Sequence, residues 1–187
     1  MAIPVLEGLK SAEVIVIASE SCGAMLKVFY PELFAKTTYA DDANDLAAKV
    51  YEFSDFLVTK LGNPDFGARF LAKVTFHDGC HGLRELGKKK EPRTLLSQVR
   101  DLELVETGEA ETCCGFGGTF SAKFPMIFTA MGEVKCASAI ETGADYIISN
   151  DSSCLMHIQG LLDREGKLIA RVTSNASSCL ARMARKN

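Results

Sequence analysis

The stretch Thr112–Phe120, with the sequence TCCGFGGTF, places two adjacent cysteines in front of three glycines within four positions. Neighbouring side chains in a helix or strand point in different directions, so a cysteine pair contributes little to packing there. In a glycine-rich turn the backbone can adopt angles that other residues resist, and both sulfurs can be directed at one centre. Backbone N–H groups can also approach the sulfurs closely, which tunes a metal or cluster held by thiolates. The stretch therefore predicts a metal-binding turn whose other ligands lie elsewhere in the chain.

The chain has 187 residues, 47% of them hydrophobic, and a formal net charge of -3. This length suits one ordinary domain or two small ones, and the composition is sufficient for a hydrophobic core. The charge gives no support for nucleic-acid binding, and the short run Lys88–Lys90 is interpreted as a solvated loop. No stretch is apolar over enough residues to span a bilayer, and the N-terminus lacks the features of a signal peptide. The expected location is therefore the cytoplasm.

Seven cysteines in such a chain favour metal or redox chemistry over structural disulfides, and an odd number fits a disulfide framework poorly. They are Cys22, Cys80, Cys113, Cys114, Cys136, Cys154 and Cys179.

Short apolar runs alternate with segments of helical character, which predicts a parallel sheet in an α/β domain. The predicted strands are residues 14–17, 74–76, 102–105, 146–148 and 168–172. The predicted helices are residues 1–11, as the end of a helix, a segment that runs from the turn at residues 18–23 towards Phe34, and residues 41–61, 91–99, 124–142, 154–163 and 174–185, with a linker over residues 63–72.

The chain contains a partial internal repeat, because Val14–Leu26 resembles Tyr146–Ile158. Each segment holds an apolar run, a serine-rich turn, a cysteine and a helix. Aligning Cys22 with Cys154 places Ser21 on Ser153 and Ser19 on Asp151. We therefore expect a truncated N-terminal repeat over residues 1–68, without a Cys-Cys-Gly turn, and a complete C-terminal repeat over residues 69–187.

Three cysteine-bearing turns each follow a predicted strand. They carry Cys80, the pair Cys113-Cys114, and Cys154. The carboxyl ends of parallel strands meet at one edge of a sheet, where open α/β sheets build their sites. Four thiolates at that edge match the ligand requirement of an iron–sulfur cluster and would equally satisfy a structural zinc ion.

The pattern Cys-x32-Cys-Cys-Gly-x35-Asp-x-x-Cys, over residues 80–154, resembles the cysteine-rich CCG domain. That domain recurs in heterodisulfide reductase, in the glycolate oxidase iron–sulfur subunit and in the small subunit of anaerobic glycerol-3-phosphate dehydrogenase. The stretches Cys113–Ser121 and Ser153–Ile158 are most similar to the lactate utilization protein A type. The resemblance covers most of residues 14–166.

This resemblance implies a three-layer, Rossmann-like CCG fold and an iron–sulfur electron-transfer subunit of a complex that oxidises L-lactate or glycolate. The other subunits of that complex would be its partners, and any association with a membrane would arise through them. The resemblance implies a [4Fe–4S] cluster with four cysteine ligands, which are Cys80, Cys113, Cys114 and Cys154. Cys22 matches the corresponding cysteine of the first repeat and is a further candidate ligand, and Asp151 stands where the fullest family pattern has another cysteine.

Other assignments stay open for several residues near these turns. Asp151 is a candidate ligand, a hydrogen-bond acceptor beside the ligands, or a helix N-cap. His77 and His81 flank Cys80, and each is a candidate ligand, a hydrogen-bond donor to a ligand, or a satisfied turn residue. His157 is expected to cap or pack, and Cys136 to pack in the core.

Two other functions remain open besides the electron-transfer subunit, which would not be catalytic on its own. In one, the same thiolates bind zinc and staple the fold. In the other, Cys113-Cys114 performs thiol–disulfide exchange, although the absence of a CxxC motif counts against it. No motif of a hydrolase, flavin site or nicotinamide site stands out in the sequence.

Overall fold

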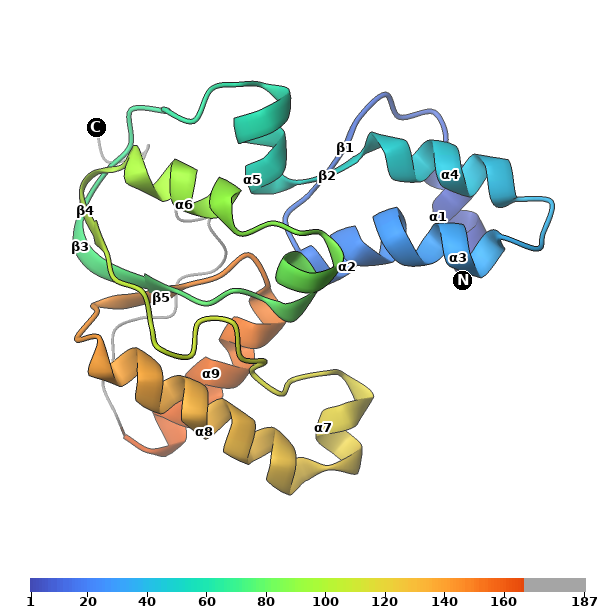
Figure 1. Cartoon of the computed structure of the whole chain (residues 1–187). Helices are drawn as coiled ribbons and strands as arrows, with labels where there is room; N and C mark the ends of the chain where they lie inside the picture. The colour runs from blue at the N-terminus through green and yellow to red at the C-terminus, as the bar shows by residue number, and fades with distance from the viewer. Residues whose placement is uncertain (167–187) are drawn as a thin grey trace.

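The computed structural model describes residues 1–166, and its strands form two parallel sheets (Figure 1). The smaller sheet pairs β1 (Ile15–Ile17) with β2 (Val50–Glu52). The larger sheet has the order β4-β3-β5, with β3 at Arg69–Phe76, β4 at Arg100–Leu104 and β5 at Tyr146–Ile148. Every pairing is parallel, which confirms the predicted α/β fold class.

Helices connect these strands. The α-helices are α1 (Ala2–Leu9), α2 (Glu20–Ala24), α3 (Tyr30–Phe34), α4 (Ala40–Lys49), α5 (Phe53–Asp55), α6 (Lys90–Ser97), α7 (Thr119–Lys123), α8 (Pro125–Glu141) and α9 (Ser152–Arg164). Three π-helical turns are η1 (Met25–Phe29), η2 (Phe56–Lys60) and η3 (His81–Glu85). No helix within residues 1–166 is long and apolar enough to cross a membrane.

The larger sheet is the middle of three layers, with α6 over one face and α8 and α9 over the other (Figure 1). Successive side chains of a strand point to opposite faces. Ile148 therefore packs in the core that includes Leu96 of α6, while Ile147 packs with Ile158 and Leu162 of α9. At β5 and the end of β3 both faces of the sheet are buried, as expected for parallel strands, while the edge strand β4 stays partly exposed.

The N-terminal elements enclose a separate core, in which Leu6, Tyr30, Leu46 and Val50 are buried. Here the prediction of one helix over residues 41–61 is wrong, because β2 interrupts it. Val50 is fully buried and pairs with Ile15. Since β-branched and aromatic residues favour a pleated, half-buried surface, pairing with β1 overrides the helical spacing of the apolar residues.

Other boundaries follow the sequence more closely. The segment from Glu20 to Phe34 is continuously helical through α2, η1 and α3, as predicted. Strand β3 begins at Arg69, inside the predicted linker over residues 63–72, and α7 was not predicted. The predicted strand over 168–172, the predicted helix over 174–185 and Cys179 lie outside the described residues.

The strand order creates a topological switch point between β3 and β5. The chain passes from β3 to β4 on one side and then crosses back to β5 on the other side of β3. In open α/β sheets, ligands bind in the crevice at the carboxyl ends of such strands. The turn after β3 and the turn after β5 therefore lie side by side at this edge, where the His77 N–H donates to the carbonyl of Ile148 at 2.8 Å.

Candidate metal centre

The structure brings together the four cysteines that the sequence singled out. Cys80 follows β3 and begins η3, the pair Cys113-Cys114 lies in the loop after β4, and Cys154 lies in the first turn of α9. Their sulfurs form a continuous chain of contacts, in which Cys80 and Cys114 each donate to Cys113 and Cys114 also contacts Cys154. Three turns that are distant in sequence thus direct four sulfurs at one region.

This chain of contacts divides the thiols into two classes. Hydrogen bonds from Cys114 and Cys80 hold the pKa of Cys113 well below its ordinary value, and a hydrogen bond from Cys114 lowers the pKa of Cys154. The pKa values of Cys80 and Cys114 are raised, first by their hydrogen bonds to Cys113 and then by burial. Because metals bind thiolates, two of the four sulfurs are already disposed to ionise.

His77 lies beside the buried end of this sulfur chain. One ring nitrogen of His77 and the sulfurs of Cys114 and Cys154 all lie within 4.8 Å of one another, and all three residues are buried. Imidazole and thiolate together suit zinc and iron centres. The ring hydrogen-bonds the Cys154 sulfur and so helps to lower the pKa of Cys154, and it has no nitrogen or oxygen partner among the described residues. The donor set fits a metal centre.

The glycine of the Cys-Cys-Gly turn has a positive φ of 89°. A side chain there would place its Cβ 2.9 Å from the Cβ of Met131 and 3.0 Å from the carbonyl oxygen of Phe128. Only glycine allows both this backbone conformation and so close an approach to α8. The N–H of Gly115 donates to the sulfur of Cys113 at 3.3 Å, which supports the role expected of this turn.

His157 fixes the same turn from the other side. Its Nε2 lies 3.2 Å from the carbonyl oxygen of Phe128, and its ring stacks on Phe128 at 3.7 Å between centroids. It also hydrogen-bonds the backbone of Cys114. His157 therefore holds the cysteine turn against α8 and α9, which confirms the packing interpretation.

The turn that carries Cys80 is held by an ion pair that sequence reasoning missed. The carboxylate of Asp78 accepts two hydrogen bonds from the guanidinium of Arg93, each at 2.8 Å, and its side chain is 1% exposed. Arg93 also binds Glu106, which follows β4. Paired, planar contacts of this kind fix orientation as well as charge. Arg93 thus joins α6 to the turns after β3 and β4.

Two further buried charges near the site were also missed. The carboxylate of Glu20 lies over Gly79 and Gly82, and burial, with Glu52 and Asp151 nearby, raises its pKa well above the ordinary value. The ammonium of Lys135 donates to the carbonyl of Ala110 at 3.0 Å and to that of Glu109, and burial lowers its pKa.

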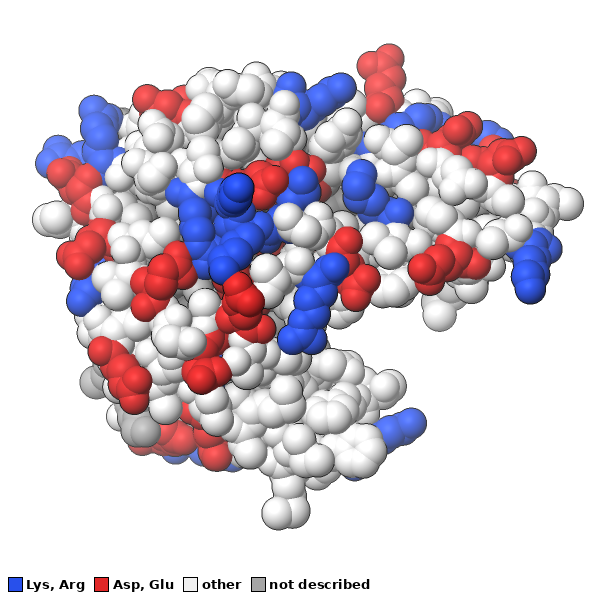
Figure 2. Space-filling model, viewed as in Figure 1, with Lys and Arg blue, Asp and Glu red and all other residues white. Residues whose placement is uncertain are grey.

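The positive side chains around α6 are largely matched by carboxylates. Figure 2 shows them gathered over the loop that leads into this helix, with acidic groups between them. Lys88 lies 2.9 Å from Asp55, and Lys89 binds Glu111. The predicted solvated loop is therefore partly an ion-pair network, with Lys88 only 21% exposed.

Asp151 caps α9, as the N-cap interpretation predicted. Its Oδ1 accepts hydrogen bonds from the N–H and the hydroxyl of Ser153, at 3.1 and 2.6 Å. Its Oδ2 accepts from the N–H of Ser21 at 3.1 Å, so both oxygens are engaged.

The remaining candidates occupy different surroundings. His81 Nδ1 lies 3.7 Å from the sulfur of Cys80. Cys22 is exposed on α2, and none of the contacts that link the other four cysteines involves it. Cys136 is buried between α8 and α9, where its sulfur donates to the carbonyl of Ile158 at 3.7 Å, which confirms core packing.

Comparison with known proteins places these features in a family. A family model described as a cysteine-rich domain, CCG, matches residues 74–159, which include all four clustered cysteines. The chain is 44% identical over 163 residues to lactate utilization protein A of Oceanobacillus iheyensis, covering 87% of this chain and 66% of that protein. Identity is also 44% to the proteins of the same name from Shouchella clausii and Bacillus subtilis, covering 69% and 68% of their lengths and 88% and 87% of this chain. The chain thus spans about two thirds of the length of these relatives. With the Cys-Cys-Gly turn and its partner cysteines at one sheet edge, the chain belongs to the lactate utilization protein A family of CCG-domain proteins.

Proposed function

We propose that this chain is an electron-transfer subunit that holds a [4Fe–4S] cluster through Cys80, Cys113, Cys114 and Cys154. The observation that carries the proposal is the unbroken contact of four sulfurs from three separate turns. Four cysteine thiolates are the usual ligand set of such a cluster. A disulfide framework would require pairs, and the four clustered cysteines are free thiols.

The names of the relatives support the proposed substrate class. The relatives are named for lactate utilization. Oxidation of L-lactate, or of another 2-hydroxy acid such as glycolate, to the 2-oxo acid removes two electrons and two protons. The sequence has no recognisable flavin or nicotinamide site, so a partner subunit would carry out the hydride chemistry. This chain would then relay the electrons within a cytoplasmic complex.

A bound cluster would supply a one-electron carrier, and the chain's own residues would set its potential. Hydrogen bonds to sulfur, local charge and solvent exposure are the protein's means of doing so. The N–H of Gly115 donates to Cys113, and the positive charge of Arg84 acts on both Cys80 and Cys113. Each stabilises negative charge on the sulfurs and favours the reduced state. Cys114 and Cys154 are buried, while Cys80 and Cys113 are partly exposed, so the latter pair faces the expected path to a partner.

A single zinc ion is the second candidate, because His77, Cys114 and Cys154 converge within 4.8 Å. With Zn–S bonds of about 2.3 Å, two thiolates of a tetrahedral site stand roughly 3.8 Å apart. Such a site would hold the turns after β3, β4 and β5 together without redox chemistry.

Anaerobic purification followed by iron, acid-labile sulfide and zinc analysis tests the proposal. We expect iron and sulfide in near-equal amounts in the wild-type chain, strongly reduced in Cys113→Ser and Cys114→Ser. Cys136→Ser is the matched control, because Cys136 is buried in the neighbouring core and should leave the iron content unchanged. Zinc without sulfide would support the second candidate. A metal-free chain with reversibly oxidised thiols would instead support thiol–disulfide exchange.

A further inference from the structure

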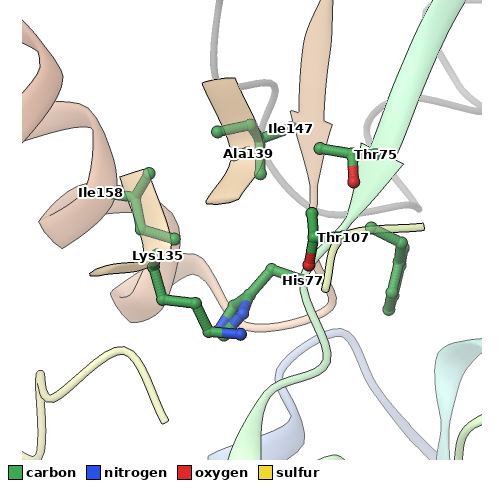
Figure 3. Close-up of a pocket in the computed structure, with 8 residues that line it drawn as sticks. Thr75, His77, Thr107, Lys135, Ala139, Ile147 and Ile158 are labelled. Atoms are coloured by element: carbon green, nitrogen blue, oxygen red, sulfur yellow. The ribbon is translucent and has the colours of Figure 1, made fainter. Parts of the chain in front are cut away.

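The histidine at the end of β3 occupies an unusual environment. His77 is 5% exposed, and its backbone N–H extends the sheet by donating to Ile148. The backbone is thus fixed, and the ring is buried under α8 and α9. Figure 3 shows the ring and the end of the Lys135 side chain at the same small cavity.

Apart from the Cys154 sulfur, the nitrogens of this ring have no hydrogen-bond partner among the described residues. Within residues 1–166, only four buried side-chain nitrogen or oxygen atoms are unpartnered, and two of them belong to His77. An unsatisfied buried polar atom costs about 1–3 kcal/mol, so native proteins rarely retain one without a reason. A neutral imidazole has one donor and one acceptor nitrogen, and the nitrogen that does not reach Cys154 still needs a partner.

The ring borders both the cysteines and a cavity. The sulfurs of Cys114 and Cys154 lie within 4.8 Å of a ring nitrogen and of each other. His77 also lines a cavity of about 10 Å³, with space for about one water molecule. The unpartnered hydroxyl of Thr75 and the side chain of Lys135 line this cavity with His77. Histidines that bind metals generally donate their other N–H to a carbonyl, carboxylate or water.

We propose that His77 is a nitrogen ligand of the metal centre, bound at its buried end beside Cys114 and Cys154. The second ring nitrogen faces the cavity and donates its proton to a water that Thr75 also binds. The proposal deepens the proposed function, since it rests on a metal being held at these cysteines. The chain then offers one nitrogen and four sulfur donors, and the neutral imidazole adds a ligand without adding negative charge to the centre.

The two histidines beside Cys80 differ in ways that the test can use. The Nδ1 of His81 lies 3.7 Å from the sulfur of Cys80, at the partly exposed end of the centre. His157, the remaining histidine of the chain, already uses its Nε2 on the carbonyl of Phe128. His81 is therefore the matched control for His77.

The test is pulsed electron paramagnetic resonance of the dithionite-reduced, iron-loaded chain. We expect a strong nitrogen hyperfine coupling. Its ¹⁴N pattern should be replaced by a ¹⁵N pattern when the protein contains ¹⁵N-histidine. His77→Gln should abolish this coupling, and His81→Gln should retain it. His77→Cys should restore the iron content lost in His77→Gln, because a thiolate can replace the imidazole. If the His77 variants do not fold, the ¹⁵N-histidine-labelled His81→Gln variant is sufficient for the test. Only His77 and His157 remain in it, and His157 is hydrogen-bonded elsewhere, so a retained coupling comes from His77.

Each result separates this inference from the proposed function. Bound iron without strong histidine coupling, or coupling that survives His77→Gln, overturns the assignment of His77 and leaves the cluster intact. If the chain binds zinc and no iron, the cluster proposal fails. His77 is then tested by ¹¹³Cd NMR of the cadmium-substituted chain, where an unchanged resonance in His77→Gln refutes it. A chain that binds neither metal refutes both proposals.

Discussion

Replacing Arg93 by alanine is expected to be among the most destabilising changes at the surface of α6. The guanidinium lies 2.8 Å from each oxygen of Asp78, whose side chain is 1% exposed. Arg93→Ala leaves that carboxylate buried and unpaired. The same change removes the contact with Glu106, but that carboxylate is 48% exposed and can be hydrated.

The magnitude follows from these two exposures. Breaking a buried ion pair by removing one partner costs about 3–5 kcal/mol. Losing an exposed pair costs roughly 0–1 kcal/mol, because water screens it. A domain of this size has a free energy of unfolding of about 5–15 kcal/mol, so Arg93→Ala removes a large part of it. With a urea m-value of about 2 kcal/mol per molar, the unfolding midpoint should fall by about 1.5–2.5 M.

Urea unfolding followed by circular dichroism measures this shift, with Glu106→Gln as the matched control. The control removes only the exposed partner and should move the midpoint by less than about 0.5 M. Arg93→Lys should lie between the two, because an ammonium cannot form both contacts at once. If Arg93→Ala and Glu106→Gln shift the midpoint equally, the buried pair with Asp78 does not hold the Cys80 turn as argued.

Three further changes probe the turns around the centre. Gly115→Ala should lower the iron-to-protein ratio several-fold, because alanine resists a φ of 89° and its Cβ would crowd Met131; Gly108→Ala, which meets open space, should keep the wild-type ratio. Asp151→Ala should lower the free energy of unfolding by about 1–2 kcal/mol and Asp151→Asn by much less, since asparagine also caps helices; equal losses in urea unfolding would contradict the capping role. Burial raises the pKa of Glu20, so the folded state binds more protons than the unfolded state above the ordinary value of 4.5, and stability falls as pH rises towards the folded pKa. Glu20→Gln should therefore match the wild type at pH 4 or below in metal-free protein and exceed it at pH 7–8, and a gain independent of pH would exclude this linkage.

The position of the cysteines could be predicted from the sequence because the signal is local. Short apolar runs precede the turns of Cys80 and Cys154, and each run became a parallel strand of one sheet. A strand followed directly by a turn fixes the turn at the carboxyl edge, whatever the details of packing. Cys136 could be distinguished from the candidate ligands for the same reason, since it lies within a helix, away from any strand end.

The charges that hold the site could not be predicted, because their partners are far away in the sequence. Asp78 and Arg93 meet only when α6 packs on the sheet. Lys135, which belongs to α8, reaches the loop after β4 only when α8 packs against it. Glu20 belongs to the N-terminal segment, and nothing in its neighbourhood in the chain indicates burial. β2 could not be predicted for a related reason. Its three residues fit the apolar spacing of a helix, and their strand conformation depends on pairing with β1, which is far away in the sequence.

One carboxylate shows how the N-terminal segment becomes part of the site. In the alignment of the partial repeat, Ser21 matches Ser153, and Asp151 accepts a hydrogen bond from the backbone N–H of each. The N–H of Glu20 likewise donates to the carbonyl of Asn150 at 3.3 Å. The two similar turns therefore meet at the carboxyl edge of the larger sheet, where α2 covers the turns that follow β3 and β5. Because the buried carboxylate of Glu20 in this cover acts electrostatically on Cys154, residues of the N-terminal segment outside the candidate ligand set still influence the polarity of the candidate centre.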